Sequence, residues 1–253
     1  MASCTHASCS PTSENVFGWY DFAWSGGSFE VCFRPGGHFF APKFQAASKW
    51  QMVVQDVGGH GHNEGNGHAH EGHAHEGHAH DGHAHGHGNK KCIVRIDWGA
   101  KFGQYELEFD PATKAMKGMC TSTPNASMEK DWRTAAFKRP ISPVEAALFG
   151  EGAGSEWMFQ WSGGEFPVIF KGDGYNHFQC HQFPAHAHWS LAEDGLLTIF
   201  WEKFGTYEMR VDPVNRLMEG SAKGEPENWR KARFTGNLPF TGQTDIVECA
   251  HHH

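Results

Sequence analysis

The chain repeats itself, and this internal duplication limits the folds open to its 253 residues more than any other feature. The segment FAWSGGSFEV at 22–31 returns as FQWSGGEFPV at 159–168, and KFGQYEL at 101–107 returns as KFGTYEM at 203–209. Shorter matches follow in the same order: Asp110-Pro111 with Asp212-Pro213, Met116 and Gly118 with Met218 and Gly220, and Trp132-Arg133 with Trp229-Arg230. Rare residues in one shared order indicate two copies of a single folding unit.

Both copies have the pattern of short antiparallel strands. Apolar and polar residues alternate along 29–33, 105–109 and 197–201, as in strands with one buried face. Turn signals such as Gly26-Gly27 and Asp194-Gly195 separate the runs, and no long amphipathic helix lies between them. We therefore predict an all-β fold of two tandem antiparallel β-meander units, each barrel-like or sandwich-like. The pattern leaves open whether the two copies close into one barrel or two.

The duplication also sets the expected domain boundaries. The segment VEAALF at 144–149 predicts one short helix between the copies, followed by a Gly-rich stretch. We expect a flexible N-terminus at 1–16, a first β repeat at 17–139 with an insertion at 58–89, a linker with a short helix at 140–155, a second β repeat at 156–236 and a C-terminal tail at 237–253.

The order of features resembles that of calycin-type barrels, the class of the lipocalins and fatty-acid-binding proteins. An early Trp stands near the start of each copy, hairpins follow one another, and a Trp-Arg pair comes near the end (Trp132-Arg133 and Trp229-Arg230). The lipocalin Gly-x-Trp opening is missing, since Gly18-Trp19 has no spacer. The resemblance covers each copy and implies the fold alone. A duplicated lectin barrel with Trp and Gly-Gly motifs would show much the same pattern.

Charge and hydropathy exclude several classes of partner. The formal net charge is −8 with the 20 His neutral, and Lys and Arg are scattered rather than gathered in a stripe, so we expect no nucleic-acid partner. No run approaches the roughly 18 apolar residues of a membrane span. The first ten residues lack a basic segment followed by an apolar one, so we expect no secretory signal.

Cysteine usage favours a reducing compartment. The seven Cys are odd in number, form no CxxC pair and do not recur between the copies. A disulfide scaffold is therefore not expected, and a cytoplasmic location fits best. The sequence does not indicate an oligomeric state.

A His-rich insertion interrupts the first copy where the second has a short Asp194-Gly195 turn. It repeats a five-residue period of Gly, His, Ala, His and, in most units, an acidic residue. The candidate ligands in it are His68, His70, His73, His75, His78, His80, His83 and His85. Imidazole nitrogen suits Zn²⁺ and also Ni, Cu and Co. We interpret the insertion as a metal-binding loop for buffering or delivery; the alternative is a tolerated low-complexity expansion of a surface hairpin.

A second His cluster occurs only in the second copy, and its candidate ligands are His177, His181, His186 and His188. On a strand, His186 and His188 point to the same face with Cα atoms about 6.6 Å apart, which lets two imidazoles meet one ion. If 182–185 turn the chain, His181 lies across from His186 and His177 joins the same face. Cys180 would point the other way, as a buried thiol.

The first copy offers a different interpretation of this cluster. Matching Phe44 with Phe183 and Trp50 with Trp189 puts Lys49 at the position of His188. A Lys there indicates a face that solvent can reach, so the His could be ordinary surface residues. Because His38 matches His177, that shared pair also fits a turn or core role with satisfied hydrogen bonds.

Three functions from different classes remain open on the residues alone. The first is a metal-binding barrel protein that buffers or delivers zinc or nickel through the loop and the second-copy cluster. The second is a module that binds a small apolar or sugar ligand through its aromatic residues, with incidental metal binding. The third is a zinc-dependent hydrolase or lyase with Glu202 or Glu208 as base. No nucleophile–base pair or carboxylate dyad assigns catalytic residues, so the sequence does not decide whether the chain is an enzyme.

Overall fold

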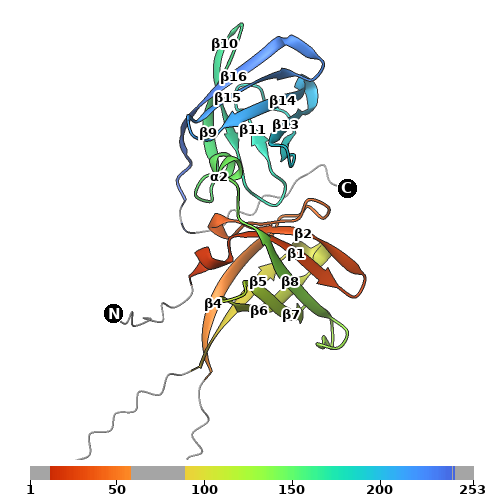
Figure 1. Ribbon diagram of the computed structural model, residues 1–253. Coiled ribbons are helices and arrows are strands. Elements are labelled where there is room, and N and C mark those ends of the chain that lie inside the picture. Colours follow the sequence, from red (N-terminus) through yellow and green to blue (C-terminus); the bar gives the residue numbers. More distant parts are fainter. Residues whose placement is uncertain (1–11, 58–88, 241, 243–253) are drawn as a thin grey trace, which may run out of the picture.

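The computed structural model describes residues 12–57, 89–240 and 242. It places the strands in two eight-stranded antiparallel sheets, one from each copy of the repeat. Figure 1 shows the two units one above the other, with the linker helix between them. The prediction of an all-β fold of two tandem antiparallel units is therefore confirmed, and each copy forms its own sheet rather than sharing one barrel.

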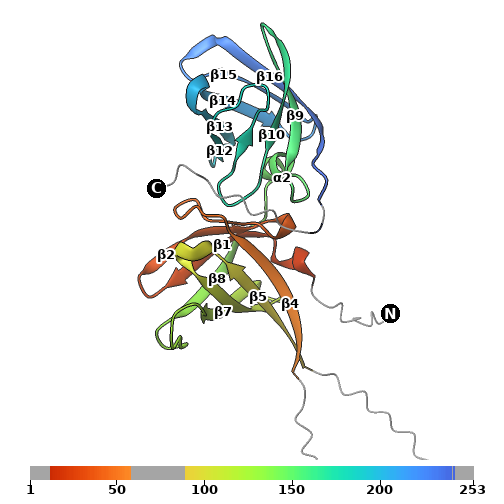
Figure 2. The same ribbon diagram turned by 180° about the vertical axis from the view of Figure 1, so that it is seen from behind.

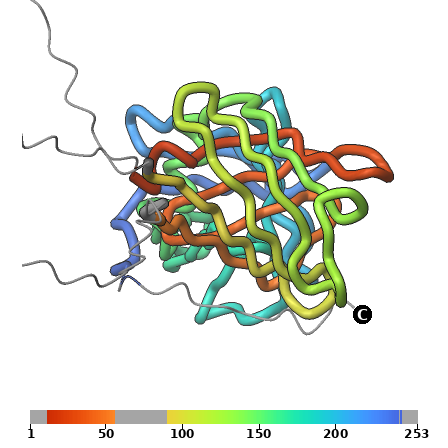
Figure 3. The backbone as a smooth tube through the Cα atoms, turned by 90° about the horizontal axis from the view of Figure 1, so that it is seen from below, coloured from red at the N-terminus to blue at the C-terminus, as the bar shows by residue number. Residues whose placement is uncertain are grey.

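The first unit has its strands in the spatial order β3-β2-β1-β8-β7-β6-β5-β4. Its elements are η1 (Ser13–Val16), β1 (Gly18–Trp24), β2 (Gly27–Phe33), η2 (Pro35–Gly37), β3 (Phe39–Phe40), β4 (Lys49–Val57), β5 (Asn89–Asp97), α1 (Gly99–Phe102), β6 (Gln104–Asp110), β7 (Ala115–Cys120) and β8 (Trp132–Arg139). In the view from below, β5 to β8 lie in front and β1 and β2 behind them, so the sheet curls back on itself (Figure 3).

The second unit has the equivalent order, β11-β10-β9-β16-β15-β14-β13-β12. It follows the linker helix α2 (Pro143–Phe149) and comprises β9 (Ser155–Trp161), β10 (Gly164–Phe170), β11 (Phe178–Gln179), β12 (Ala187–Leu191), β13 (Leu196–Trp201), η3 (Glu202–Phe204), β14 (Gly205–Asp212), β15 (Leu217–Ala222) and β16 (Glu225–Asn237). The same pairing scheme in both units is the structural counterpart of the sequence duplication.

Each sheet nearly closes into a barrel where its two edge strands meet. In the first unit the closing contact is an isolated bridge between His38 and Lys49, and in the second unit it is a bridge between His177 and His188. These equivalent bridges confirm that Lys49 is the counterpart of His188. The second bridge also brings two of the candidate metal ligands to the seam of their barrel.

Alternation along the strands fills both barrels with aromatic and aliphatic side chains. Along β6 the residues Tyr105, Leu107 and Phe109 are buried while their neighbours are exposed. In the second unit Leu197 and Ile199 of β13 are fully buried. Each unit has its own core of this kind, because the inward face of each strand can be removed from water only against the opposite wall of its barrel.

The alternation fails along β2, where Cys32 is buried although it lies between the inward-facing Val31 and Phe33. Cys32 packs with Trp19 and Phe40 in a separate small cluster. These side chains are on the outer face of the first barrel, and the linker segment covers them, as Figures 1 and 2 show for α2. The period-2 pattern of a single strand carries no information about such a cover.

Helix α2 is attached to the first unit through a buried carboxylate. Ser142 and Glu145 form a capping box at its start. The Glu145 carboxylate accepts a hydrogen bond from Trp19 Nε1 at 2.7 Å and pairs with Arg139 at 2.9 Å. Burial would raise the pKa of Glu145, but the hydrogen bonds from Arg139 and Ser142 hold it below its ordinary value.

The Tyr and Arg residues that recur in both copies have a framework role. Tyr105 and Tyr207 are both buried. Arg230 donates to the Tyr207 hydroxyl at 2.9 Å and lies over its ring, and Arg133 lies over the ring of Tyr105. These contacts join β14 to β16 and β6 to β8 inside each barrel, so these recurring residues stabilise the fold. Within the described part of the chain, every helix falls short of the length and apolar character that a membrane crossing needs.

Removing 58–88 and joining Val57 to Asn89 through an Asp-Gly turn should leave the fold intact. Val57 and Asn89 already face each other as the last pair of the β4–β5 ladder, and the second unit makes the same connection with residues 192–195. The entropy of loop closure changes by only about 0.6 kcal/mol per doubling of length. Calorimetry should therefore find a melting temperature within about 5 °C of the parent. Loss of the cooperative transition would show that the insertion is part of the fold.

Candidate functional site

The second-copy cluster lies where β10, β11 and β12 meet at the barrel seam. The loop 172–176 leads from β10 into β11, and the chain returns through a turn into β12. Backbone hydrogen bonds from Lys171 N to His177 O and from Trp189 N to Asn176 O, both 2.9 Å, fix the two ends of this loop. The site is therefore built on strand ends that the barrel itself holds in place.

His177 is oriented by a buried carboxylate. Its Nδ1 lies 2.5 Å from Asp173 Oδ2, and the same carboxylate accepts the backbone N–H groups of Tyr175 and His177. Burial would raise the pKa of Asp173, but the contact with His177 and the backbone hydrogen bonds outweigh it and lower that pKa. Asp173 is thus an ionised, buried acceptor that fixes the direction of one imidazole.

His188 and His186 contact each other directly. His188 Nδ1 lies 2.9 Å from the carbonyl oxygen of Tyr175, and His188 Nε2 lies 2.7 Å from His186 Nε2. A carbonyl oxygen only accepts, so Nδ1 of His188 carries a proton. In the neutral pair, His188 Nε2 then accepts and His186 Nε2 donates. The surroundings therefore fix both tautomers and direct one lone pair of His188 toward its neighbour.

The structure brings three of the four predicted His together. The ring of His188 lies 5.0 Å from that of His177 and 4.3 Å from that of His186, between ring centres. His181 is exposed in the turn after β11, and its ring shares no hydrogen bond or ring contact with the other three among the described residues. The expectation that His181 lies across from His186 stays a prediction. Cys180 is buried in the core, as expected for the opposite face.

The three rings do not form a ready-made coordination shell. Across residues 12–57, 89–240 and 242, no group of three or more His, Cys, Asp or Glu is arranged to hold one metal ion. What the cluster offers is a pair of nitrogens 2.7 Å apart with a third imidazole beside it. A further carboxylate, that of Glu202 in η3, accepts the backbone N–H of His186 at 3.2 Å.

The predicted ligands of the insertion lie outside the described residues. They are His68, His70, His73, His75, His78, His80, His83 and His85. The structure shows only that the strands on either side, β4 and β5, pair with each other up to the insertion.

Sequence reasoning missed the residues that orient the rings, Asp173 and Tyr175. A signal for them exists in the duplication. The loop 172–176 is two residues longer than its counterpart 35–37, and Asp173 and Tyr175 both lie within it. A difference in spacing between two copies marks a position where one copy has gained something that the shared fold does not require.

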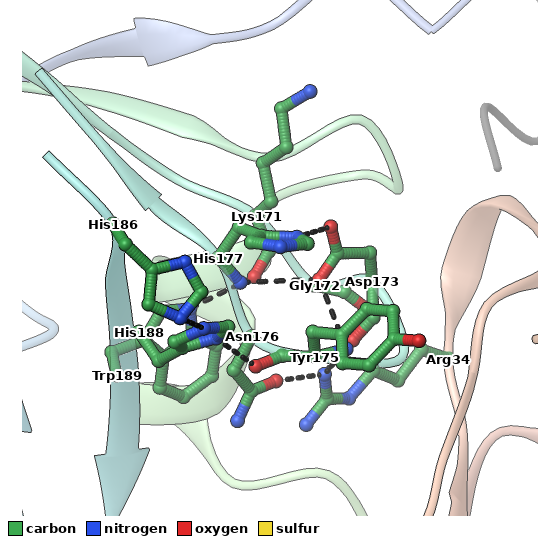
Figure 4. Close-up of polar contacts among 10 residues, drawn as sticks. All are labelled: Arg34, Lys171, Gly172, Asp173, Tyr175, Asn176, His177, His186, His188 and Trp189. Atoms are coloured by element: carbon green, nitrogen blue, oxygen red, sulfur yellow. Dashed lines mark hydrogen bonds and ion pairs between the residues drawn. The ribbon is translucent and has the colours of Figure 1, made fainter. Parts of the chain in front are cut away.

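Arg34 of the first unit was also missed, although it contacts the same loop. It is 1% exposed, and its Nη1 donates to Asn176 Oδ1 at 2.6 Å and to Gly172 O at 3.0 Å. Figure 4 shows the loop between this guanidinium on one side and the His rings on the other. No pattern within one repeat predicts this contact, because it joins residues of different repeats.

His38, the counterpart of His177, has the buried role expected of it. It is buried beside η2, close to the backbone of Gly152 in the linker. Burial lowers the pKa of His38, while the nearby Asp173 opposes this shift. His177 fits both the core role and the role of a candidate ligand, since it is buried and hydrogen-bonded and also lies beside His188.

The loop difference, the fixed tautomers and the interface with Arg34 are properties of this chain itself. They give an imidazole cluster that is oriented by hydrogen bonds at the seam of a barrel. Comparison of the chain with protein-family models, with curated proteins and with solved structures found no match in any of the three.

Proposed function

We propose that this chain binds divalent transition-metal ions of the zinc or nickel type through imidazole, and that it buffers or delivers them. The observation that carries the proposal is the 2.7 Å approach of His186 Nε2 to His188 Nε2, with His188 held through its Nδ1 by the Tyr175 carbonyl. Metal-bound His residues commonly donate their second ring N–H to a carbonyl or carboxylate in this way.

The geometry needs only a small change to accept an ion. At a metal–nitrogen distance of about 2.0–2.1 Å and a tetrahedral angle, two ligand nitrogens lie about 3.3 Å apart. The His186 and His188 nitrogens would have to separate by roughly 0.6 Å, and the proton on His186 Nε2 would have to move to the Nδ1 of the same ring, which leaves both Nε2 lone pairs for the ion. His177, held by Asp173, is the third imidazole that a side-chain movement could add, and water would complete the shell.

In this proposal the insertion binds many metal ions, whereas the cluster binds one ion at a defined site. Its eight predicted ligands stand in pairs two residues apart, from His68-x-His70 to His83-x-His85, and imidazoles in such numbers bind zinc, nickel or copper in many equivalent ways. The insertion joins two strands that pair without it, so a large change in its metal content need not disturb the barrel.

The calycin-type and lectin-like alternative ranks second. A ligand-binding barrel of that class needs an internal cavity. Both interiors here are occupied by packed rings, with Phe39 against Trp98 at 4.9 Å in the first unit and Phe178 against Trp201 at 5.1 Å in the second. That packing favours a structural role for the aromatic residues.

The zinc-enzyme alternative ranks third. Of its two candidate bases, Glu208 forms an ion pair with Lys223 at 2.9 Å, and Glu202 accepts a backbone N–H. Both carboxylates are engaged in local contacts that do not require a reaction.

Zinc titration of the chain at two pH values tests the proposal. The protein, lacking His251–His253 and purified without a metal column, should bind several zinc ions near pH 7 and lose nearly all of them at about pH 5. The reason is that protons compete for the same nitrogens, whose ordinary pKa is about 6.5. A chain lacking 58–88 should keep about one tightly bound ion near pH 7. Capacity that is unchanged at the lower pH would assign the binding to carboxylates or thiols, and no uptake by either protein near neutral pH would overturn the proposal.

A further inference from the structure

The loop 172–176 has two faces, and one of them holds the imidazoles. On this face Asp173 contacts His177, and the carbonyl oxygen of Tyr175 accepts from His188. The positions of both acceptors depend on the path of the loop backbone. A displacement of that backbone by a fraction of the hydrogen-bond length would release the rings from their fixed tautomers.

The other face of the loop is held by Arg34 of the first unit. Its Nη1 donates to Gly172 O at 3.0 Å, Asp173 O at 3.4 Å and Asn176 Oδ1 at 2.6 Å. The guanidinium lies over the rings of Phe40, Phe149 and Trp189, at 4.2, 4.8 and 5.6 Å from their centres. Burial lowers the pKa of Arg34, yet a guanidinium stays charged even so. These three acceptors, together with the nearby carboxylates of Glu145 and Asp173, compensate its buried charge.

The first unit also packs directly against the loop. At Gly174 a Cβ atom would overlap the carbonyl oxygen of Ala46 and lie 2.7 Å from Ser48 Oγ. The ring of Tyr175 is buried with Ala47. The loop is thus clamped between the first unit and β12, so its backbone has no freedom to shift while the two units are in contact.

We propose that Arg34 is a positioning residue for the His cluster, so that the first unit sets the metal affinity of the second. The inference deepens the proposed function and rests on it. Arg34 touches no imidazole; it fixes the backbone that carries Asp173 and the Tyr175 carbonyl, and these fix His177 and His188. Because such coupling is reciprocal, an ion bound at the cluster tightens the contact between the units.

The comparison of the two copies supports a dedicated role. The counterpart of Arg34 is Lys171, since each donates its backbone N–H to the carbonyl of the following His, His38 or His177, at 2.9 Å. Arg34 is 1% exposed and reaches across to the other unit, whereas Lys171 is only half-buried. The fold does not require a buried cation at this position, because the second copy forms the same bridge without one.

The test uses the full-length chain and a measurement that needs no metal. In the metal-free protein, nitrogen-15 spectra of the His side chains should show His188 in its Nδ1–H form. The variants Arg34→Met and Asn176→Gly should convert it to a mixture of tautomers; Gly keeps the positive φ of 56° at position 176. Arg233→Met is the matched control, because it removes a guanidinium of the second unit that pairs with Glu165 and makes no contact with the loop.

Cobalt(II) then reports on the site itself through the paramagnetic shifts of His186 and His188. The cobalt(II) concentration that half-saturates the site should rise about 10- to 100-fold in the two loop variants and stay unchanged in the control. An unchanged His188 tautomer in Arg34→Met overturns the inference, and if that variant does not fold, Asn176→Gly decides alone. If the tautomer changes in the variants but the His resonances of the wild-type protein do not respond to cobalt(II), Arg34 remains the positioning residue and the metal function is rejected.

Discussion

Replacing either Gly118 or Gly220 with Ala should destabilise its unit by about 3 kcal/mol or more. The two residues are counterparts in β7 and β15, and they lie opposite Leu107 and Met209 of the neighbouring strands. A Cβ at either position would overlap a carbonyl oxygen of the neighbouring strand, that of Glu106 or Glu208, and lie 2.7 Å from a Cα atom. Backbone atoms cannot rotate away as a side chain could, so the strands would have to separate.

Urea unfolding followed by circular dichroism measures this effect, with Gly236→Ala as the control. Gly236 lies in β16, and a Cβ there would meet nothing within 4 Å, so its replacement should change stability by less than about 0.5 kcal/mol. Equal midpoints for the parent and Gly118→Ala would show that β6 and β7 do not approach as closely as described.

These glycines show what the duplication could predict about the fold. Their recurrence in both copies marks them as framework positions, and the alternation at 105–109 predicts the buried face of β6 correctly. The outer-face cluster of Trp19, Cys32 and Phe40 could not be predicted in the same way. Its burial depends on the docking of the linker, a long-range contact that leaves no local period in the sequence.

In the candidate site, too, the local relations could be predicted from the sequence and the long-range contacts could not. The i, i+2 spacing of His186 and His188 predicts that the two rings meet, because that relation is local to one strand. The placement of His181 depends on the shape of a turn, which its residue types do not determine, so its part in the site stays a prediction. Asp173 and Arg34 were not predicted as part of the site. Asp173 lies in the loop 172–176, which is longer than its counterpart in the first copy, and Arg34 lies in the other repeat.

Changing both His186 and His188 to Ala should abolish tight stoichiometric zinc binding in the chain that lacks 58–88. Those two residues supply the only imidazole nitrogens within 3 Å of each other in the described part of the chain. Without them, His177 is a single ligand beside Asp173, and one imidazole cannot hold zinc tightly at neutral pH. Calorimetry should find the affinity lowered by more than about 100-fold, beyond the effect of removing an orienting group alone.

The matched control is Lys49→Ala, which changes the counterpart of His188 at the seam of the first barrel. Lys49 is exposed, so its replacement should alter neither zinc affinity nor stability. The double variant should fold, because it loses two side-chain hydrogen bonds, one to the Tyr175 carbonyl and one between the two rings, at about 1 kcal/mol each. It should, however, lose the rise in melting temperature that zinc gives the parent, since an ion that binds only the folded chain at 100 times its Kd stabilises it by about 2.7 kcal/mol. If the affinity and the melting shift are the same before and after the double change, the rings at the seam take no part in metal binding and the insertion alone accounts for it.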